Sequence, residues 1–138
     1  MYEKIMVPVD LAHIDALQKS LQVSADMARH FKAEVCYVGV TANTPGPVGR
    51  TPAEYEQKLA AFAEAQGRLH GQPTDCRVII SHDPTADLDN LLVKAIDDVG
   101  ADLVVMGTHL PHKVDAIMPS HGDKLAKHTK ASVFLVRP

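Results

Sequence analysis

Residues 5–10 have the sequence Ile5-Met6-Val7-Pro8-Val9-Asp10, an uninterrupted apolar run that ends on an acidic residue. Four further apolar runs follow at residues 34–40, 76–80, 102–106 and 132–136. Most of these runs are continuous rather than alternating, which is typical of strands covered on both faces, as in a parallel sheet. The opening of the chain therefore predicts the first strand of such a sheet.

Stretches with a helical period separate these runs. Apolar and small residues recur every three or four positions in three of them, at Leu17-Leu21-Ser24-Ala28-Phe31, Tyr55-Leu59-Phe62-Ala63 and Leu88-Leu92-Ala95-Val99. Thr51 and Pro52 predict the start of the second helix, and Gly100 predicts the end of the third. A weaker fourth helix is expected over residues 120–129.

The alternation of strand and helix predicts one doubly wound α/β domain over residues 1–138, with three layers and right-handed crossovers. The long irregular segment Thr41–Pro52 is expected to be a loop or lid after the second strand. In such a fold, ligands bind beyond the carboxyl ends of the strands, where the strand order reverses. The residues that directly follow the strands are therefore the candidates for a site.

The composition excludes several classes of partner. The chain has 138 residues, 46% of them hydrophobic, and a formal net charge of -3, so a nucleic-acid backbone is not an expected partner. No apolar run approaches the roughly 20 residues that span a bilayer, and no secretory signal region opens the chain. We therefore expect a soluble cytoplasmic protein in which Cys36 and Cys76 are buried thiols rather than a disulfide.

Two groups of polar residues at these strand ends suggest a ligand site. Asp10 has two open interpretations: its carboxylate accepts hydrogen bonds from an adenine amine or a ribose hydroxyl, or it caps the following helix. Gly107 permits close approach of the backbone to a ligand, or simply turns the chain. Ser120 and His121 open the expected last helix, whose free N–H groups attract anions such as phosphate.

The sequence lacks the motifs of several enzyme classes. It contains no P-loop, no Gly-x-Gly-x-x-Gly turn after the first strand and no Gly-x-Ser-x-Gly elbow. The eight histidines include no pair with a cysteine or carboxylate at zinc spacing, so no metal site is expected.

Three segments together resemble the universal stress protein family, of the UspA type. Residues 2–10 are similar to the family's first strand, which has the pattern ILVPVD. Residues 82–109, from His82-Asp83-Pro84 to Met106-Gly107-Thr108-His109, are similar to its GDP…GADLIVMGSH stretch. Residues 131–137 are similar to its last strand, CPVLVVR. The resemblance covers essentially the whole chain.

This resemblance implies the adenine nucleotide alpha hydrolase-like fold, with five mainly parallel strands in the order 3-2-1-4-5. It also implies a nucleotide cleft between the first and fourth strands. A homodimer is implied as well, in which the last strand pairs with its copy across a twofold axis. The run from Val133 to Val136 fits that arrangement, because an apolar edge strand is a liability that dimerisation removes.

The resemblance further implies a nucleotide site, and this sequence departs from it in part. The implied ligand-binding residues are Pro8, Val9, Asp10, Val40, Met106, Gly107, His109, Ser120 and His121. Members that bind ATP carry Gly-x-x-Gly, nine residues and then Gly-Ser/Thr. Here Leu110 stands at the second glycine and Pro119 at the third, and the intervening loop is one residue short. Proline has no N–H to donate to a phosphate.

Three functions follow from this pattern. The first is a non-catalytic, homodimeric stress-response protein that binds ATP or AMP weakly, with Mg²⁺ only if a triphosphate is bound. The second is a regulatory module that works without nucleotide. The third is a slow ATPase, for which His109, His121 and Asp10 are the candidate groups.

Overall fold

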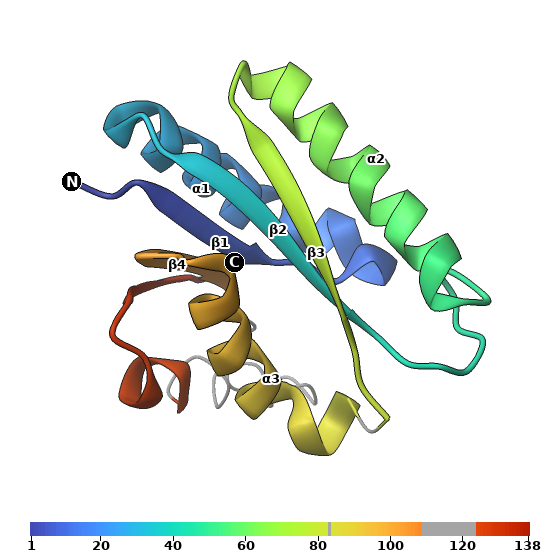
Figure 1. Cartoon of the computed structure of the whole chain (residues 1–138). Coiled ribbons are helices and arrows are strands. Elements are labelled where there is room, and N and C mark those ends of the chain that lie inside the picture. The colour runs from blue at the N-terminus through green and yellow to red at the C-terminus, as the bar shows by residue number, and fades with distance from the viewer. Residues whose placement is uncertain (83, 109–123) are drawn as a thin grey trace.

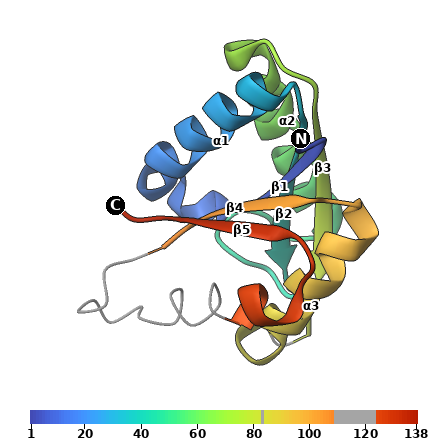
Figure 2. The same ribbon diagram turned by 90° about the vertical axis from the view of Figure 1, so that its left-hand side faces the viewer.

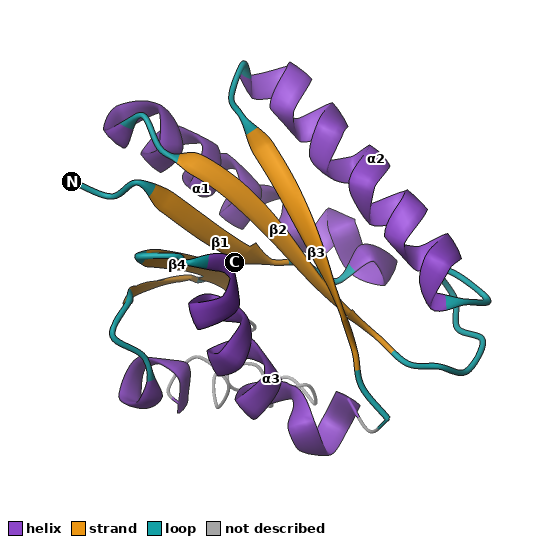
Figure 3. Cartoon of the chain, viewed as in Figure 1, coloured by secondary structure: helices purple, strands orange, loops and turns teal. Residues whose placement is uncertain are grey.

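The computed structural model of the chain contains one five-stranded sheet with helices on both faces (Figures 1 and 3). The described residues are 1–82, 84–108 and 124–138. The strands are β1 (Lys4–Pro8), β2 (Glu34–Thr41), β3 (Thr74–Ile80), β4 (Leu103–Gly107) and β5 (Ser132–Val136). The helices are the 3₁₀ helix η1 (Leu11–Leu17), α1 (Gln18–Phe31), α2 (Pro52–His70) and α3 (Pro84–Val99), and residues 124–128 are also helical.

The strand order is β3-β2-β1-β4-β5, and every neighbouring pair is parallel. Figure 2 shows α1 and α2 on one face of the sheet, and α3 with residues 124–128 on the other. The predicted three-layer fold and its strand order are thus confirmed.

Two apolar cores lie on the two faces of the sheet. On the α1 and α2 face, Leu21 and Leu59 pack on Val7, Tyr37 and Val105. On the opposite face, Leu92, Ile96 and the fully buried Leu125 pack on other strand residues, among them Met6 and Val104. Because successive strand residues face opposite sides, the continuous apolar runs of the sequence supply both cores.

The signals for helix ends act as the sequence predicts. The Thr51 hydroxyl accepts a hydrogen bond from the Glu54 N–H at 3.1 Å, and Pro52 occupies the first position of α2. Gly100, which follows α3, has φ of 76°, a conformation that glycine adopts without a Cβ clash.

The 3₁₀ helix η1 precedes α1 as a separate element that the sequence does not predict. None of its side chains is fully buried, although Leu11 and Leu17 pack against the core, and only its last residue, Leu17, belongs to the apolar stripe of the first predicted helix. Asp10 caps η1 by accepting a hydrogen bond from the Ala12 N–H at 3.0 Å.

Asp102 joins the amino ends of β1 and β4. One carboxylate oxygen accepts a hydrogen bond from the Glu3 N–H at 2.9 Å, and the other accepts one from the Lys4 N–H at 3.1 Å. The Asp102 N–H in turn donates to the Lys4 carbonyl at 3.0 Å. This carboxylate therefore helps to set the register of the two central strands.

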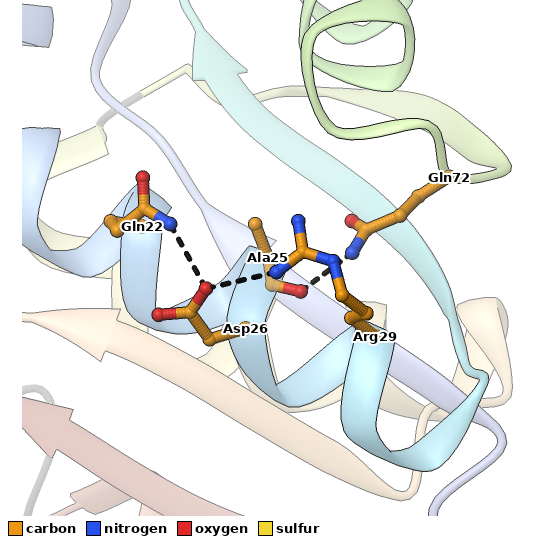
Figure 4. A network of polar contacts seen from close by, with 5 residues as sticks. All are labelled: Gln22, Ala25, Asp26, Arg29 and Gln72. Atoms are coloured by element: carbon orange, nitrogen blue, oxygen red, sulfur yellow. Dashed lines mark hydrogen bonds and ion pairs between the residues drawn. The ribbon is translucent and has the colours of Figure 1, made fainter.

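A polar network joins α1 to the turn that leads into β3 (Figure 4). The Gln72 side-chain amide donates to the Ala25 carbonyl of α1 at 2.6 Å. Beside it, Asp26 accepts hydrogen bonds from Gln22 at 2.9 Å and from Arg29 at 3.2 Å. The network fixes α1 relative to the far end of α2.

The segment between β2 and α2 is held against α2. The Lys58 ammonium donates to the Val48 carbonyl, and the Arg50 N–H donates to the Glu54 carboxylate at 3.2 Å. A Cβ on Gly49 would lie 2.9 Å from the Tyr55 nitrogen, so this backbone approaches the helix closely. Opening of this segment as a lid would have to break these contacts.

Among the described residues, no helix has the length and apolar character needed to cross a membrane.

Candidate functional site

The strand order reverses between β1 and β4. From β1 the chain continues into η1 and α1 on one face of the sheet, whereas the helical residues after β4 lie on the opposite face (Figure 2). Connections that diverge in this way leave a crevice at the carboxyl ends of the two strands. The crevice is where the sequence predicts a ligand.

Three predicted apolar site residues lie on one face of the sheet near this end. Pro8 ends β1, Val40 lies near the end of β2, and Met106 lies near the end of β4. By strand alternation, all three share the face that carries Met6, Val38 and Val104. Pro8 and Val40 are half-buried, so both keep surface for a ligand. Met106 is only 1% exposed and lies in the middle of the paired strands, so it offers no exposed surface to a ligand.

Asp10 follows β1 at the carboxyl end of the sheet and has an exposed carboxylate. One oxygen accepts the capping hydrogen bond from Ala12, and the other lies 2.8 Å from His13 Nδ1. The capping interpretation of Asp10 is therefore confirmed. A carboxylate accepts about four hydrogen bonds, so the cap leaves acceptor capacity for a ligand.

The contact between Asp10 and His13 is not anticipated by the sequence analysis. The signal that points to it is the spacing of three residues in Asp-x-x-His, directly after a strand. The side chains of Asp10 and His13 are 62% and 73% exposed. A ligand that binds Asp10 therefore meets an imidazole beside the carboxylate.

Gly107 has a structural role, because it lies in close contact with α1 and the end of η1. A Cβ at this position would lie 3.1 Å from the Ser20 hydroxyl oxygen and 3.3 Å from the Leu17 side chain. The glycine therefore lets the end of β4 approach the start of α1. The neighbouring Thr108 is also structural, because its N–H donates to the Val136 carbonyl at 2.9 Å.

Tyr55 of α2 packs on the carboxyl-end half of β2. From the sequence it is predicted only as a core residue. Its ring lies over Gly39, where a Cβ would come within 2.4 Å of the hydroxyl oxygen. Burial raises the pKa of Tyr55 to about 12, and the negative charge of Asp10 adds to the rise. A neutral phenol thus lies within electrostatic range of the exposed carboxylate.

Three predicted site residues, His109, Ser120 and His121, lie outside the described residues, as do Leu110 and Pro119. The phosphate side of the predicted site therefore remains a sequence-based prediction. Of the predicted set, the structure places Pro8, Val9, Asp10, Val40, Met106 and Gly107 at the carboxyl ends of three adjacent strands.

The two cysteines are free thiols, as predicted, although only Cys36 is fully buried and Cys76 is half-buried. Burial raises the pKa of Cys36 to about 11, which makes its thiolate scarce at neutral pH. Over the described ranges, His, Cys, Asp and Glu form no group of three that could hold a metal ion.

A comparison with protein families shows the family of this chain. The model of the universal stress protein family matches residues 1–137. The chain belongs to the universal stress protein family. No curated protein sequence matches it.

Solved universal stress proteins have the same fold. A family member from Burkholderia pseudomallei has a TM-score of 0.70 and 21% identity, over 98% of this chain and 96% of that one. The Archaeoglobus fulgidus protein in complex with dAMP has a TM-score of 0.65 and 22% identity, over 97% of each chain. The Arabidopsis thaliana protein with AMP bound has a TM-score of 0.69 and 14% identity, over 98% of this chain and 91% of that one. At these identities, the similarity shows the fold alone.

Proposed function

We propose that this universal stress protein binds an adenine nucleotide, AMP or ATP, weakly in the crevice between β1 and β4. The observation that carries the proposal is the exposed Asp10 carboxylate beside half-buried Pro8 and Val40, at the point where the strand order reverses. Similar proteins were solved in complex with dAMP and with AMP, which supports this ligand class.

The chemistry of the described residues fits the adenosine part of a nucleotide. An exposed carboxylate accepts hydrogen bonds from the adenine amine or the ribose hydroxyls, and the Pro8 and Val40 side chains offer apolar surface to the base. Gly107, at the end of β4, completes this half of the proposed site. Mg²⁺ would accompany only a triphosphate.

The phosphate part of the site is weakened by two residues of the sequence. Pro119 has no N–H to donate, and Leu110 adds bulk where the family has glycine. The loss of one charge-assisted hydrogen bond costs roughly 1.5–3 kcal/mol, about 10- to 150-fold in affinity. His109, Ser120 and His121 are the remaining candidates for the phosphates, and we expect AMP to lose less affinity than ATP.

A calorimetric titration with AMP, ATP and GMP tests the proposal. We expect saturable binding of AMP and ATP, with affinities that differ little, and weaker binding of GMP. Asp10→Asn should lower the AMP affinity by about tenfold, since it removes the charge and one acceptor oxygen. Asp97→Asn removes an exposed carboxylate on α3 and serves as the control. Absence of AMP and ATP binding at millimolar concentration would contradict the proposal.

The second candidate is a regulatory module that works without nucleotide. Two observations favour it: both Asp10 oxygens are engaged within the loop, and the close approach that Gly107 allows is taken by α1. Mass spectrometry of small molecules released from freshly purified protein separates the two candidates. Released AMP or ATP supports the first, whereas protein that carries no nucleotide and also shows no binding in the titration supports the second.

We also propose that the protein forms a homodimer through β5. This strand is at the edge of the sheet, and Phe134 and Leu135 are 44% and 40% exposed, although Val136 is buried in the core. Pairing with a second copy would cover this apolar edge. Light scattering should show a dimer that Phe134→Glu converts to a monomer. Leu69→Glu, at an exposed leucine of α2, should leave the dimer intact.

In this proposal, residues 1–138 form one domain. The protein has no catalytic activity, and it acts in the stress response in the cytoplasm. Near Asp10, the structure shows only the contact between Asp10 and His13 as a pair of groups that could move a proton. We expect purified protein to release no phosphate from ATP above the rate in buffer alone, and His109→Ala and His121→Ala to leave that rate unchanged.

A further inference from the structure

A groove of about 520 Å³ follows the edge of the sheet opposite to β5. One wall is the outer edge of β3, from Cys76 to Ile80. The other wall is α3, and Glu56 of α2 adds a carboxylate at the rim. The α3 residues of the groove are Leu91, Lys94, Ala95 and Asp98. No part of this groove belongs to the crevice around Asp10.

The groove exists because the two faces of β3 are covered unequally. On one face α2 packs along β3, as Figure 1 shows, whereas on the other face α3 packs on β1 and β2. Strand alternation places Ile79 and Arg77 on the α3 side, next to this gap. Ile80 at the end of the strand is 49% exposed.

The hydrogen-bond pattern shows which backbone groups face the groove. The Ser81 N–H donates to β2, and the Pro73 carbonyl accepts from β2, so the odd-numbered residues of β3 pair inward. The N–H and C=O groups of Cys76, Val78 and Ile80 therefore point to the free edge. The Asp75 carboxylate already accepts from the Cys76 N–H at 2.8 Å. The open backbone groups are thus at Val78 and Ile80, beside the groove.

The charges around the groove lie on opposite faces of the strand edge. On the α3 side, Arg77 and Asp98 lie 3.7 Å apart and offset one another. Lys94, one helical turn before Asp98, has no ion-pair partner among the described residues. On the α2 side, Glu56 also has none within the described part of the chain, and its charge helps to raise the pKa of Cys76. The groove therefore offers a cation on one face and an anion on the other.

We propose that this groove binds an extended peptide segment of a partner protein, which adds to the sheet beside β3. The peptide backbone pairs with Val78 and Ile80, and an apolar side chain packs on Ile79 and Leu91. An acidic residue of the peptide faces Lys94, and a basic residue at an adjacent position faces Glu56. Adjacent positions are required because neighbouring side chains of a strand point to opposite faces. The surface would give a stress protein a peptide-recognition site separate from its nucleotide crevice.

Fluorescence anisotropy with the full chain and a labelled peptide tests this proposal. The probe is a blocked heptapeptide of alternating threonine and valine, with glutamate and lysine at two adjacent central positions. A peptide with glutamine at both positions tests the charges, and one with N-methylated alternate amides tests the backbone pairing. We expect saturable binding of the probe, weaker binding of the glutamine peptide and no binding of the methylated one.

Two variants of the protein locate the binding. Val78→Pro removes an outward N–H without loss of a bond to β2, and we expect about 3- to 10-fold weaker binding. Lys94→Glu reverses an exposed charge, so the fold is retained, and about 2- to 10-fold weaker binding is expected. Lys19→Glu, on α1, is the matched control and should bind as the wild type does.

Three results overturn the proposal. The first is the absence of probe binding at millimolar peptide. The second is binding that neither Lys94→Glu nor Val78→Pro weakens. The third is self-association that Val78→Pro abolishes and Phe134→Glu does not, because a second copy of the chain would then occupy this edge.

Discussion

The two ends of the central strands each carry an aspartate, and the two aspartates have different partners. At the amino ends, Asp102 accepts hydrogen bonds from Glu3 and Lys4, residues 99 and 98 positions away in sequence. At the carboxyl ends, Asp10 accepts a hydrogen bond from Ala12 and contacts His13, both in its own loop, and its side chain is largely exposed. Asp102 thus joins distant parts of the fold, whereas Asp10 remains accessible to a ligand.

Asp102→Ala should give the largest loss of stability and leave nucleotide binding unchanged. The substitution removes the acceptor for two N–H groups of β1, which we expect to cost about 2–3 kcal/mol of unfolding free energy. Chemical denaturation measures the loss, and titration with AMP measures binding in conditions where the variant is folded. If AMP affinity fell as much for Asp102→Ala as for Asp10→Ala, it would be wrong that Asp102 serves stability and Asp10 serves binding.

High pH should lower the unfolding free energy through ionisation of Tyr55, which packs at the carboxyl end of the sheet. Burial raises the pKa of Tyr55 to about 12 in the folded state, above the usual value of 10.0. The stabilisation is therefore complete below pH 10 and is lost as the pH rises toward 12. At pH 11 the wild type should lose roughly 1–2 kcal/mol of unfolding free energy through this group. Denaturation of the wild type and Tyr55→Phe at pH 7 and pH 11 measures the difference, and equal losses in both would show that Tyr55 is not the cause.

Asp10→Ala should lower the unfolding free energy less than Asp102→Ala does. It should lower the AMP affinity more. Loss of the cap on η1 is expected to cost about 1 kcal/mol of unfolding free energy, together with about tenfold in AMP affinity. Asp10→Asn keeps an acceptor for the Ala12 N–H, so it should regain most of the stability and little of the affinity. Regain of both by Asp10→Asn would indicate that Asp10 acts on the ligand only through the cap.

His13→Ala should have the smallest effect on stability. An exposed ion pair contributes about 0–1 kcal/mol, so denaturation should show a change of less than about 0.5 kcal/mol. Nucleotide titration of this variant shows whether the imidazole competes with the ligand for Asp10. Tighter AMP binding would indicate competition, and weaker binding would make His13 part of the site.

The sequence predicts the layers of this fold better than its contacts. Continuous apolar runs predict strands covered on both faces, and the strand order follows from the resemblance to the family. The helix η1 is missed as a separate element because none of its side chains is fully buried and only its last residue, Leu17, belongs to an apolar stripe. The roles of Gly39 and Gly107 are missed because each depends on an approach to a distant helix, by Tyr55 and by Ser20. A sequence shows that glycine is present there, and only the packed structure shows what it approaches.

Backbone amide NMR shifts during a titration with AMP show where the nucleotide binds. If adenosine lies at the carboxyl ends of β1 and β4, the amides of Val9, Asp10, Val40 and Gly107 shift together with one saturation curve, whereas those of Glu3, Lys4 and β3 do not. Shifts confined to other parts of the sheet, or none at saturating AMP, would contradict the claim that this protein holds adenosine at the carboxyl ends of β1 and β4.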